Sequence, residues 1–188
     1  MNTLAYCTEI AAPAVRRALG VEPLTSPPLM ASSFPRRKLR DLDMLYFRLH
    51  GEGGAVWWGE GREGDKPTAF TPRCLSGADL GGCAVVVANC YGSDDPLAVA
   101  LYRAGAEAVI AGAGPNYAGG DVVTGTDLLA RWLRLGLALG LSAQWALRLA
   151  RARLRLDVRR LALPLGDVVH PSGDALAFDV IDRPGGTA

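Results

Sequence analysis

The chain has 188 residues, of which 49% are hydrophobic, and a formal net charge of +1. A chain of this length can bury about two-thirds of its unfolded surface, so we expect a single domain over residues 1–188. The near-neutral charge excludes the basic surface typical of nucleic-acid binding, and the apolar stretches are too short to span a bilayer. We therefore expect neither a nucleic acid nor a membrane as a partner.

The cysteines and the N-terminus indicate the compartment. Cys7, Cys74, Cys83 and Cys90 form no Cys-x-x-Cys pair, and the chain has no His-x-x-x-His pair. These spacings predict no metal site. The N-terminus lacks a basic stretch followed by an apolar core, so we expect no signal peptide and a cytoplasmic chain with reduced thiols.

Strand and helix signals alternate along the chain. The first third is predicted to hold a strand over 3–7, a helix over 9–19, a proline-rich loop over 21–36 and a strand over 42–49. A hairpin within 51–64, which includes a strand over 55–58, a connection over 65–82 with a helical turn near 75–80, a strand over 85–88, a helix over 95–104 and a strand over 108–112 are expected next. The remainder is predicted as a loop over 114–125, helices over 126–139 and 143–155, a strand over 175–181 and a flexible tail over 183–188. Thr126 and Asp127 are expected to cap the helix that follows the loop. The alternation predicts an α/β fold with a mainly parallel sheet.

Two of the predicted strands end at a chemically reactive side chain. The strand over 42–49 leads into His50, and the strand over 85–88 leads into Cys90. Parallel strands that end side by side would bring the imidazole and the thiol to one edge of the sheet, where open α/β sheets bind ligands. A neighbouring imidazole lowers a thiol pKa and exchanges protons with it, so the pair predicts a nucleophilic cysteine. The alternative is that both residues only terminate their strands.

The order of these segments resembles that of the caspase-like cysteine peptidases, which include caspases, metacaspases, the gingipain and clostripain types, and the bacterial CHAT domains. His50-Gly51-Glu52-Gly53-Gly54, followed by Val56-Trp57-Trp58-Gly59, is similar to the segment in which the catalytic His-Gly precedes a small hairpin. Asn89-Cys90-Tyr91-Gly92 is similar to the strand-ending Cys-x-Gly segment. Residues 101–111 resemble the helix, turn and strand that follow the nucleophile in CHAT and gingipain-type domains, and 146–150 resemble a late CHAT helix. The resemblance covers about residues 42–155.

The resemblance implies a caspase-like three-layer α/β/α sandwich and a cysteine endopeptidase that cleaves a protein or peptide substrate. It implies that Cys90 is the nucleophile and that His50 is the general acid and base of a Cys–His dyad. The backbone N–H groups of Gly51 and Cys90 would hold the oxyanion, and no metal or organic cofactor is required. The chain departs from the clostripain-like members at Ala88, where they carry an acidic residue that binds a basic substrate side chain.

Two other functions remain open. The first is a catalytically silent CHAT-like module that binds a protein partner in a regulatory assembly. The second is a flavodoxin-like nucleotide binder that uses Gly112-Ala113-Gly114, although the chain has no Gly-x-Gly-x-x-Gly or Walker pattern.

Several residues near the strand ends are candidates for substrate binding, each with a simpler alternative. Asn89 either shapes the pocket or hydrogen-bonds the backbone. Asp94 and Asp95 either select a basic substrate residue or cap the next helix. Asn116 and Tyr117 either contact substrate from the glycine-rich loop or belong to an ordinary connection.

Three further positions are less informative. Glu52 lies near His50 in the sequence, but we assign it no role. His170 is expected in a surface loop. Trp57 and Trp58 point to opposite faces of their strand, so one of them is expected to pack inward.

Overall fold

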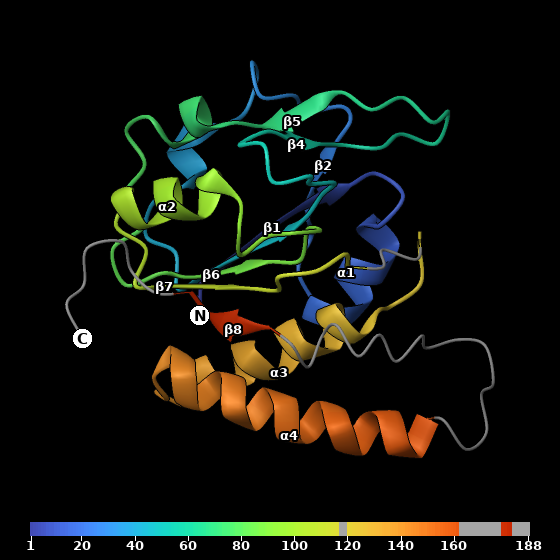
Figure 1. Cartoon of the computed structure of the whole chain (residues 1–188), viewed down its shortest axis with the longest axis vertical. Helices are drawn as coiled ribbons and strands as arrows, with labels where there is room; N and C mark the ends of the chain where they lie inside the picture. The colour runs from blue at the N-terminus through green and yellow to red at the C-terminus, as the bar shows by residue number, and fades with distance from the viewer. Residues whose placement is uncertain (117–119, 162–177, 182–188) are drawn as a thin grey trace.

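The structure is a computed structural model that describes residues 1–116, 120–161 and 178–181 (Figure 1). Its elements, in chain order, are β1 (Thr3–Thr8), α1 (Ala12–Leu19), β2 (Leu24–Ser26), the 3-10 helix η1 (Arg36–Lys38), β3 (Met44–Arg48), β4 (Trp57–Trp58), β5 (Thr68–Phe70), the 3-10 helix η2 (Pro72–Leu75), β6 (Ala84–Val87), α2 (Pro96–Arg103), β7 (Ala108–Ala111), α3 (Gly125–Ala138), α4 (Ala143–Leu161) and β8 (Asp179–Val180). The predicted tail, Tyr117 and His170 lie outside the described residues.

A six-stranded sheet in the order β2-β1-β3-β6-β7-β8 forms the centre of the molecule. All neighbouring strands are parallel except β7 and β8, which are antiparallel. The prediction of an α/β fold with a mainly parallel sheet is therefore confirmed. The central strands β3 and β6 are buried along their whole length, as expected for continuous apolar runs covered on both faces.

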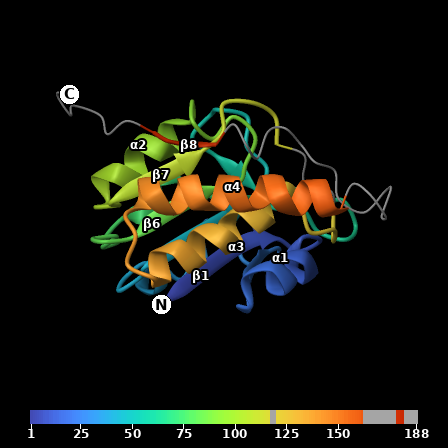
Figure 2. The same cartoon turned by 90° about the horizontal axis from the view of Figure 1, so that it is seen from below.

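Each face of the sheet has its own hydrophobic core. Tyr46 of β3 and Ile110 of β7 face a core that includes the apolar sides of α1, α3 and α4. Phe47 and Val109, one residue away on the same strands, face a second core formed with α2, β4 and β5. Figure 1 shows these two sets of elements on opposite sides of the sheet, and Figure 2 shows α3 and α4 side by side across one of them. Because successive side chains of a strand point to opposite faces of the sheet, the same strands contribute residues to both cores.

The small β4–β5 sheet corrects the predicted hairpin. β4 does not pair within 51–64; it pairs antiparallel with β5, which lies in the segment predicted as a connection. Trp57 is fully buried against Phe47 and Phe70, whereas Trp58 is half-buried, so the predicted alternation of the two tryptophans is confirmed. The helical turn expected near 75–80 is η2, at Pro72–Leu75. Strand β2 was also missed, because three residues between prolines carry no periodic signal.

The predicted helix ends are confirmed in part. Asp95 caps α2 by accepting the N–H of Leu97 at 2.9 Å. The cap of α3 is Thr124, not Thr126 or Asp127; Asp127 is the third residue of the helix and completes a reciprocal capping box with Thr124. Helix α4 continues past the predicted end, to Leu161.

Candidate active site

The ends of β3 and β6 lie against each other at the carboxyl edge of the sheet. Phe47 pairs with Val87, and the Leu49 N–H donates to Asn89 Oδ1 at 2.8 Å. A Cβ atom placed on Gly51 would lie 3.0 Å from the Cys90 carbonyl oxygen and 3.2 Å from Asn89 Cβ. A side chain at position 51 would crowd the segment that ends in Cys90, so the close approach of that segment favours glycine there.

His50 is fixed by its backbone and by a carboxylate. Its N–H and C=O exchange hydrogen bonds with Trp58, at 2.9 and 3.0 Å. Its Nε2 lies 2.7 Å from Oε2 of Glu60, and the two side chains are 33% and 30% exposed. A carboxylate can only accept, so Nε2 carries the hydrogen and a neutral His50 has its lone pair on Nδ1. The carboxylate thus selects the tautomer and leaves Nδ1 as the basic nitrogen.

Cys90 is the least buried of the four cysteines, all of which are free thiols. The Asn116 N–H donates to Cys90 Sγ at 3.2 Å, and the thiol in turn reaches the Asn116 carbonyl oxygen at 3.3 Å. Tyr91, the next residue, has φ of 54°, in the left-handed region that non-glycine residues rarely adopt. This conformation belongs to a tight turn directly after the thiol.

Asn116 is itself held by two side-chain hydrogen bonds. Its Nδ2 donates to the Ala88 carbonyl at 2.6 Å, and its Oδ1 accepts from the Thr126 hydroxyl at 2.9 Å. The residue therefore connects the β6 end to the start of α3 and fixes the backbone that contacts Cys90. The prediction that Asn116 borders the site by position agrees with this placement, but its side chain is occupied by protein partners and only its backbone faces the thiol.

Donors without partners lie beside the thiol. Within the described residues, the N–H groups of Gly51 and Cys90 donate no hydrogen bond. Asn89 is 1% exposed, and its buried Nδ2 has no partner in the part of the chain that the structure describes. A buried unpaired donor is costly unless a ligand or water satisfies it. These three donors are candidates for binding a substrate carbonyl oxygen.

Among the described residues, no hydrogen bond joins the imidazole and the thiol in this state. In the described part of the chain, the hydrogen bonds of Cys90 Sγ go to Asn116, and His50 Nδ1 has no partner. Proton transfer between the two residues therefore requires the thiol to turn away from the Asn116 carbonyl. Catalytic hydrogen bonds often form only when substrate is bound.

The two aspartates after Cys90 differ sharply. Asp95 is 2% exposed, and its carboxylate accepts from the Trp57 indole N–H at 2.9 Å, from the Ala55 N–H at 3.2 Å and from the Leu97 N–H. The capping alternative for Asp95 is therefore confirmed, and both of its carboxylate oxygens accept from protein donors. Asp94 is exposed, and its carboxylate has no partner among the described residues.

The Gly112-Ala113-Gly114 segment has a structural task that the nucleotide-binding interpretation did not foresee. The carbonyls of Gly112 and Gly114 accept the N–H groups of Ser93 and Tyr91, at 3.1 and 2.9 Å. A Cβ on Gly112 would lie 3.0 Å from the Phe178 ring. The segment supports the turn after Cys90 and is packed on its other side.

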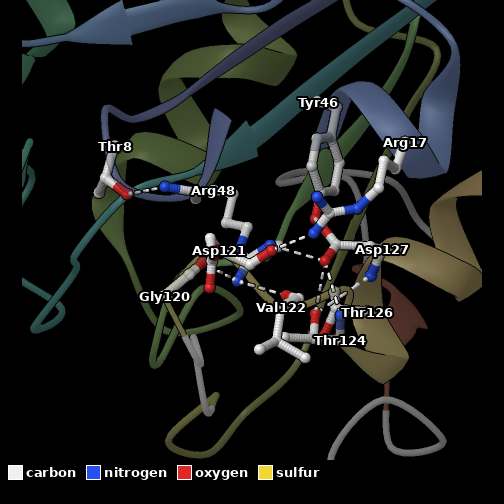
Figure 3. A network of polar contacts seen from close by, with 12 residues as sticks. Thr8, Arg17, Tyr46, Arg48, Gly120, Asp121, Val122, Thr124, Thr126 and Asp127 are labelled. Carbon is white, nitrogen blue, oxygen red and sulfur yellow. Dashed lines mark hydrogen bonds and ion pairs between the residues drawn. The ribbon is translucent and has the colours of Figure 1, made fainter. Parts of the chain in front are cut away.

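Sequence reasoning missed Glu60 and a buried ionic network behind the site. Glu60 is ten residues from His50 and belongs to no motif, whereas Glu52 is exposed and has no partner in the described chain. Arg48, two residues before His50, forms a 2.6 Å ion pair with Asp127, which also accepts from the Tyr46 hydroxyl at 2.7 Å (Figure 3). The only sequence signal for the network was a charged residue at the end of an apolar strand.

The same arginine holds the loop between β7 and α3. Its second guanidinium nitrogen donates to the carbonyls of Gly120 and Val122, at 3.1 and 3.3 Å, and Arg17 donates to the carbonyl of Asp121 between them (Figure 3). Burial raises the pKa of Tyr46 well above its usual value, so its hydroxyl stays protonated and donates to Asp127. The strand that leads into His50 and the loop that carries Asn116 are thereby joined.

Comparisons with known proteins assign the chain to no family. No protein-family model matches the chain, and no curated protein matches it. In the described residues, no helix is long and apolar enough to cross a membrane. Nor does any group of three or more His, Cys, Asp or Glu side chains in those residues have the arrangement needed to hold a metal ion.

Proposed function

We propose that the chain is a cysteine hydrolase in which Cys90 is the nucleophile, His50 the general acid and base, and Glu60 the group that orients the imidazole. More specifically, we propose a caspase-like endopeptidase acting on protein or peptide substrates. The observation that carries the proposal is the Glu60–His50 contact, which leaves Nδ1 as the base at the edge where Cys90 lies. Once the thiol turns toward Nδ1, nucleophile, base and orienting group would have the arrangement that activated nucleophiles share.

The chemistry follows from the positions of the donors. The Cys90 thiol turns from Asn116 toward His50 and transfers its proton to Nδ1 as sulfur attacks the substrate carbonyl carbon. The oxyanion accepts hydrogen bonds from the N–H groups of Gly51 and Cys90, with Asn89 Nδ2 as a third donor. The imidazolium then gives its proton to the leaving amine as the C–N bond breaks. His50 next takes a proton from water, which attacks the thioester and releases the carboxylic acid and the thiol.

The caspase-like three-layer sandwich is part of the same proposal. It is supported by the two separate cores on opposite faces of the sheet and by β4, which is the next strand in the chain after His50. The chemistry requires a free thiol and no cofactor, which suits a reducing compartment such as the cytoplasm. Asp94, exposed beside the nucleophile turn, is the remaining candidate for selecting a basic substrate side chain.

A catalytically silent, partner-binding module is the second candidate. It is favoured by one observation, namely that Cys90 Sγ bonds the Asn116 carbonyl and not His50. In that case the strand ends would keep their geometry, but the thiol would have ordinary reactivity.

Alkylation kinetics distinguish the two candidates. Cys7, Cys74 and Cys83 are buried, so limiting iodoacetamide should label Cys90 first on exposure alone, and only the rate is informative. An ordinary thiol is about 3% ionised at pH 7. We expect the wild-type protein to react at least about tenfold faster than His50→Ala at pH 7, with label mapped by mass spectrometry.

Hydrolysis of a peptide library provides the second readout. Activity should be lost in Cys90→Ala and reduced about 100-fold or more in His50→Ala. Equal alkylation rates in wild type and His50→Ala, together with no cleavage of the library, would reject the enzyme and leave the binding module.

A further inference from the structure

The outer side of α4 carries an exposed apolar stripe. Trp145, Leu149 and Leu156 are 60%, 45% and 47% exposed, and Ala152 between them is also exposed. The opposite side of the helix packs into the core of the molecule through Ala146, Leu147, Ala150 and Leu154. In Figure 1, α4 lies at the lower boundary of the molecule, and no described element lies beyond it. The helix is therefore apolar on two sides, of which the fold uses one.

The spacing of the stripe is that of a coiled-coil seam. Trp145, Leu149, Ala152 and Leu156 are separated by four, three and four residues, as are alternate d and a positions of a heptad repeat. Such a row stays on one side of a helix over three turns, about 17 Å. The preceding seam position is Ser142 and the next is Arg159, so the apolar row has defined ends. It fits one short helix laid along α4.

The charges beside the seam are all positive. Arg148 and Arg155, at the g positions, are exposed and form no ion pair within the residues the structure describes. Arg148 lies over the Trp145 ring, 4.8 Å from its centroid. Of the e positions beside the seam, Ala146 is buried, and Arg153 already contacts Asp157, the one acidic residue of α4, which also accepts from the Trp132 indole N–H. The seam therefore offers unpaired positive charge.

This charge pattern argues against a second copy of the chain as the occupant. In a parallel pair of α4 helices, Arg148 would face Arg153 of the other copy, and in an antiparallel pair the g-position arginines would face each other. Like charges at these positions oppose pairing, whereas opposite charges set partner choice.

We propose that α4 is a docking surface for an amphipathic helix of another protein, with apolar residues at its own seam and Glu or Asp where it meets Arg148 and Arg155. Trp145, at the N-terminal end of the stripe, is its largest and most exposed side chain and is the proposed anchor, since large aromatic side chains often dominate binding. The surface is independent of the strand-end site, so the inference stands whether or not the chain is a peptidase.

Synthetic peptides test the proposal on the full chain. The probe is a three-heptad helical peptide with Leu and Ile at the seam and Glu at the e and g positions, and its matched control has Lys in place of every Glu. We expect the Glu peptide to bind and to shift Trp145 fluorescence to shorter wavelength, a change that Trp145→Phe removes. Raising the salt concentration should weaken binding.

Protein variants make the test specific to the seam. Leu149→Ser should weaken binding of the Glu peptide about tenfold or more, and Gln144→Ala, exposed and off the seam, should not. The double variant Arg148→Glu, Arg155→Glu should reverse the preference in favour of the Lys peptide, and circular dichroism of each variant should remain that of the wild type.

Three outcomes would overturn the inference. The first is equal affinity for the Glu and Lys peptides. The second is self-association in sedimentation velocity that Leu149→Ser abolishes, which would make the occupant a second copy. The third is binding of vesicles of phosphatidylserine and phosphatidylcholine without binding of the Glu peptide, which would make the surface a lipid-binding one.

Discussion

Two pairs of charged or titratable groups begin two residues apart at the end of β3, and they differ in exposure. Arg48 and Asp127 are 2% and 0% exposed and lie 2.6 Å apart. His50 and Glu60 are 33% and 30% exposed and lie 2.7 Å apart. The lengths of the two contacts are nearly equal, so distance alone does not separate the pair that holds the fold from the pair proposed for chemistry.

The two pairs differ in the groups that surround them. Removing two charges from water is costly, and the buried pair offsets that cost with further hydrogen bonds from Tyr46, from the Thr124 N–H and to two loop carbonyls. Among the described residues, the exposed pair has no such support, and Nδ1 of His50 has no protein partner. The buried pair is closed to solvent and positions backbone, although Arg48 Nε has no partner among the described residues. A half-exposed pair can instead exchange protons with a substrate.

The largest expected effect is on the buried pair. Asp127→Ala leaves the Arg48 guanidinium buried without its counter-ion and removes the capping box of α3, so the free energy of unfolding should fall by about 3–5 kcal/mol. Urea unfolding followed by circular dichroism measures this change. The control is Glu22→Ala, which breaks the exposed Arg16–Glu22 pair and should have a much smaller effect. Equal decreases in the free energy of unfolding of Asp127→Ala and Glu22→Ala would contradict the expected difference between buried and exposed pairs.

The same contrast between buried and exposed groups predicts a loss of stability at alkaline pH. Burial raises the pKa of Cys7 and of Cys83 from 9.0 to about 12, and that of Tyr6 from 10.0 to about 12. Between pH 9 and 12 the native chain therefore holds protons that the unfolded chain has lost. The free energy of unfolding should decrease with rising pH in that window, by up to about 1.4 kcal/mol per pH unit for each thiol.

Removing one buried thiol isolates its contribution. Cys7→Ala should make the decrease in the free energy of unfolding between pH 8.5 and 10.5 less steep, whatever its effect at pH 7. The measurement is urea unfolding at several pH values, and parallel pH profiles for wild type and variant would show that Cys7 is not protected from ionisation.

The smallest expected effect on stability belongs to the exposed pair. Glu60→Gln keeps the shape of the side chain but removes its charge, and the free energy of unfolding should change by less than about 1 kcal/mol. Because the amide no longer dictates that Nε2 carries the hydrogen, the rate of Cys90 alkylation at pH 7 should fall about tenfold. Glu52→Gln is the matched control and should leave the rate unchanged. If Glu52→Gln slowed Cys90 alkylation and Glu60→Gln did not, Glu60 would not be the residue that orients His50.

The parts of the fold with local signals were predictable. Apolar runs identified β3, β6 and β7, and Pro96 after Asp95 identified the start of α2, because these signals lie within a few neighbouring residues. Strand β5 was missed, since Thr68–Phe70 is too short to show a period and becomes a strand only by pairing with β4. Such pairing is a property of tertiary structure.

The candidate site also has a part that local sequence signals predict and a part that depends on tertiary structure. The meeting of the segments that end in His50 and Cys90 follows from the parallel order of their strands, which the sequence pattern indicates. Glu60, by contrast, reaches His50 only because the backbone bridge between His50 and Trp58 folds the chain back on itself. The role of Asp95 was half predicted: its capping of α2 is local, and its bond to the Trp57 indole spans 38 residues.

The Asp95 carboxylate also has a consequence for motion. It binds Ala55 and Trp57 on the chain that leaves His50, and Leu97 on the chain that leaves Cys90. Neither segment can swing outward without breaking a buried hydrogen bond to the other, so the two walls of the site should open and close as one mechanical unit. In hydrogen exchange, the amides of Ala55 and Leu97 should then become exposed to solvent in the same opening event.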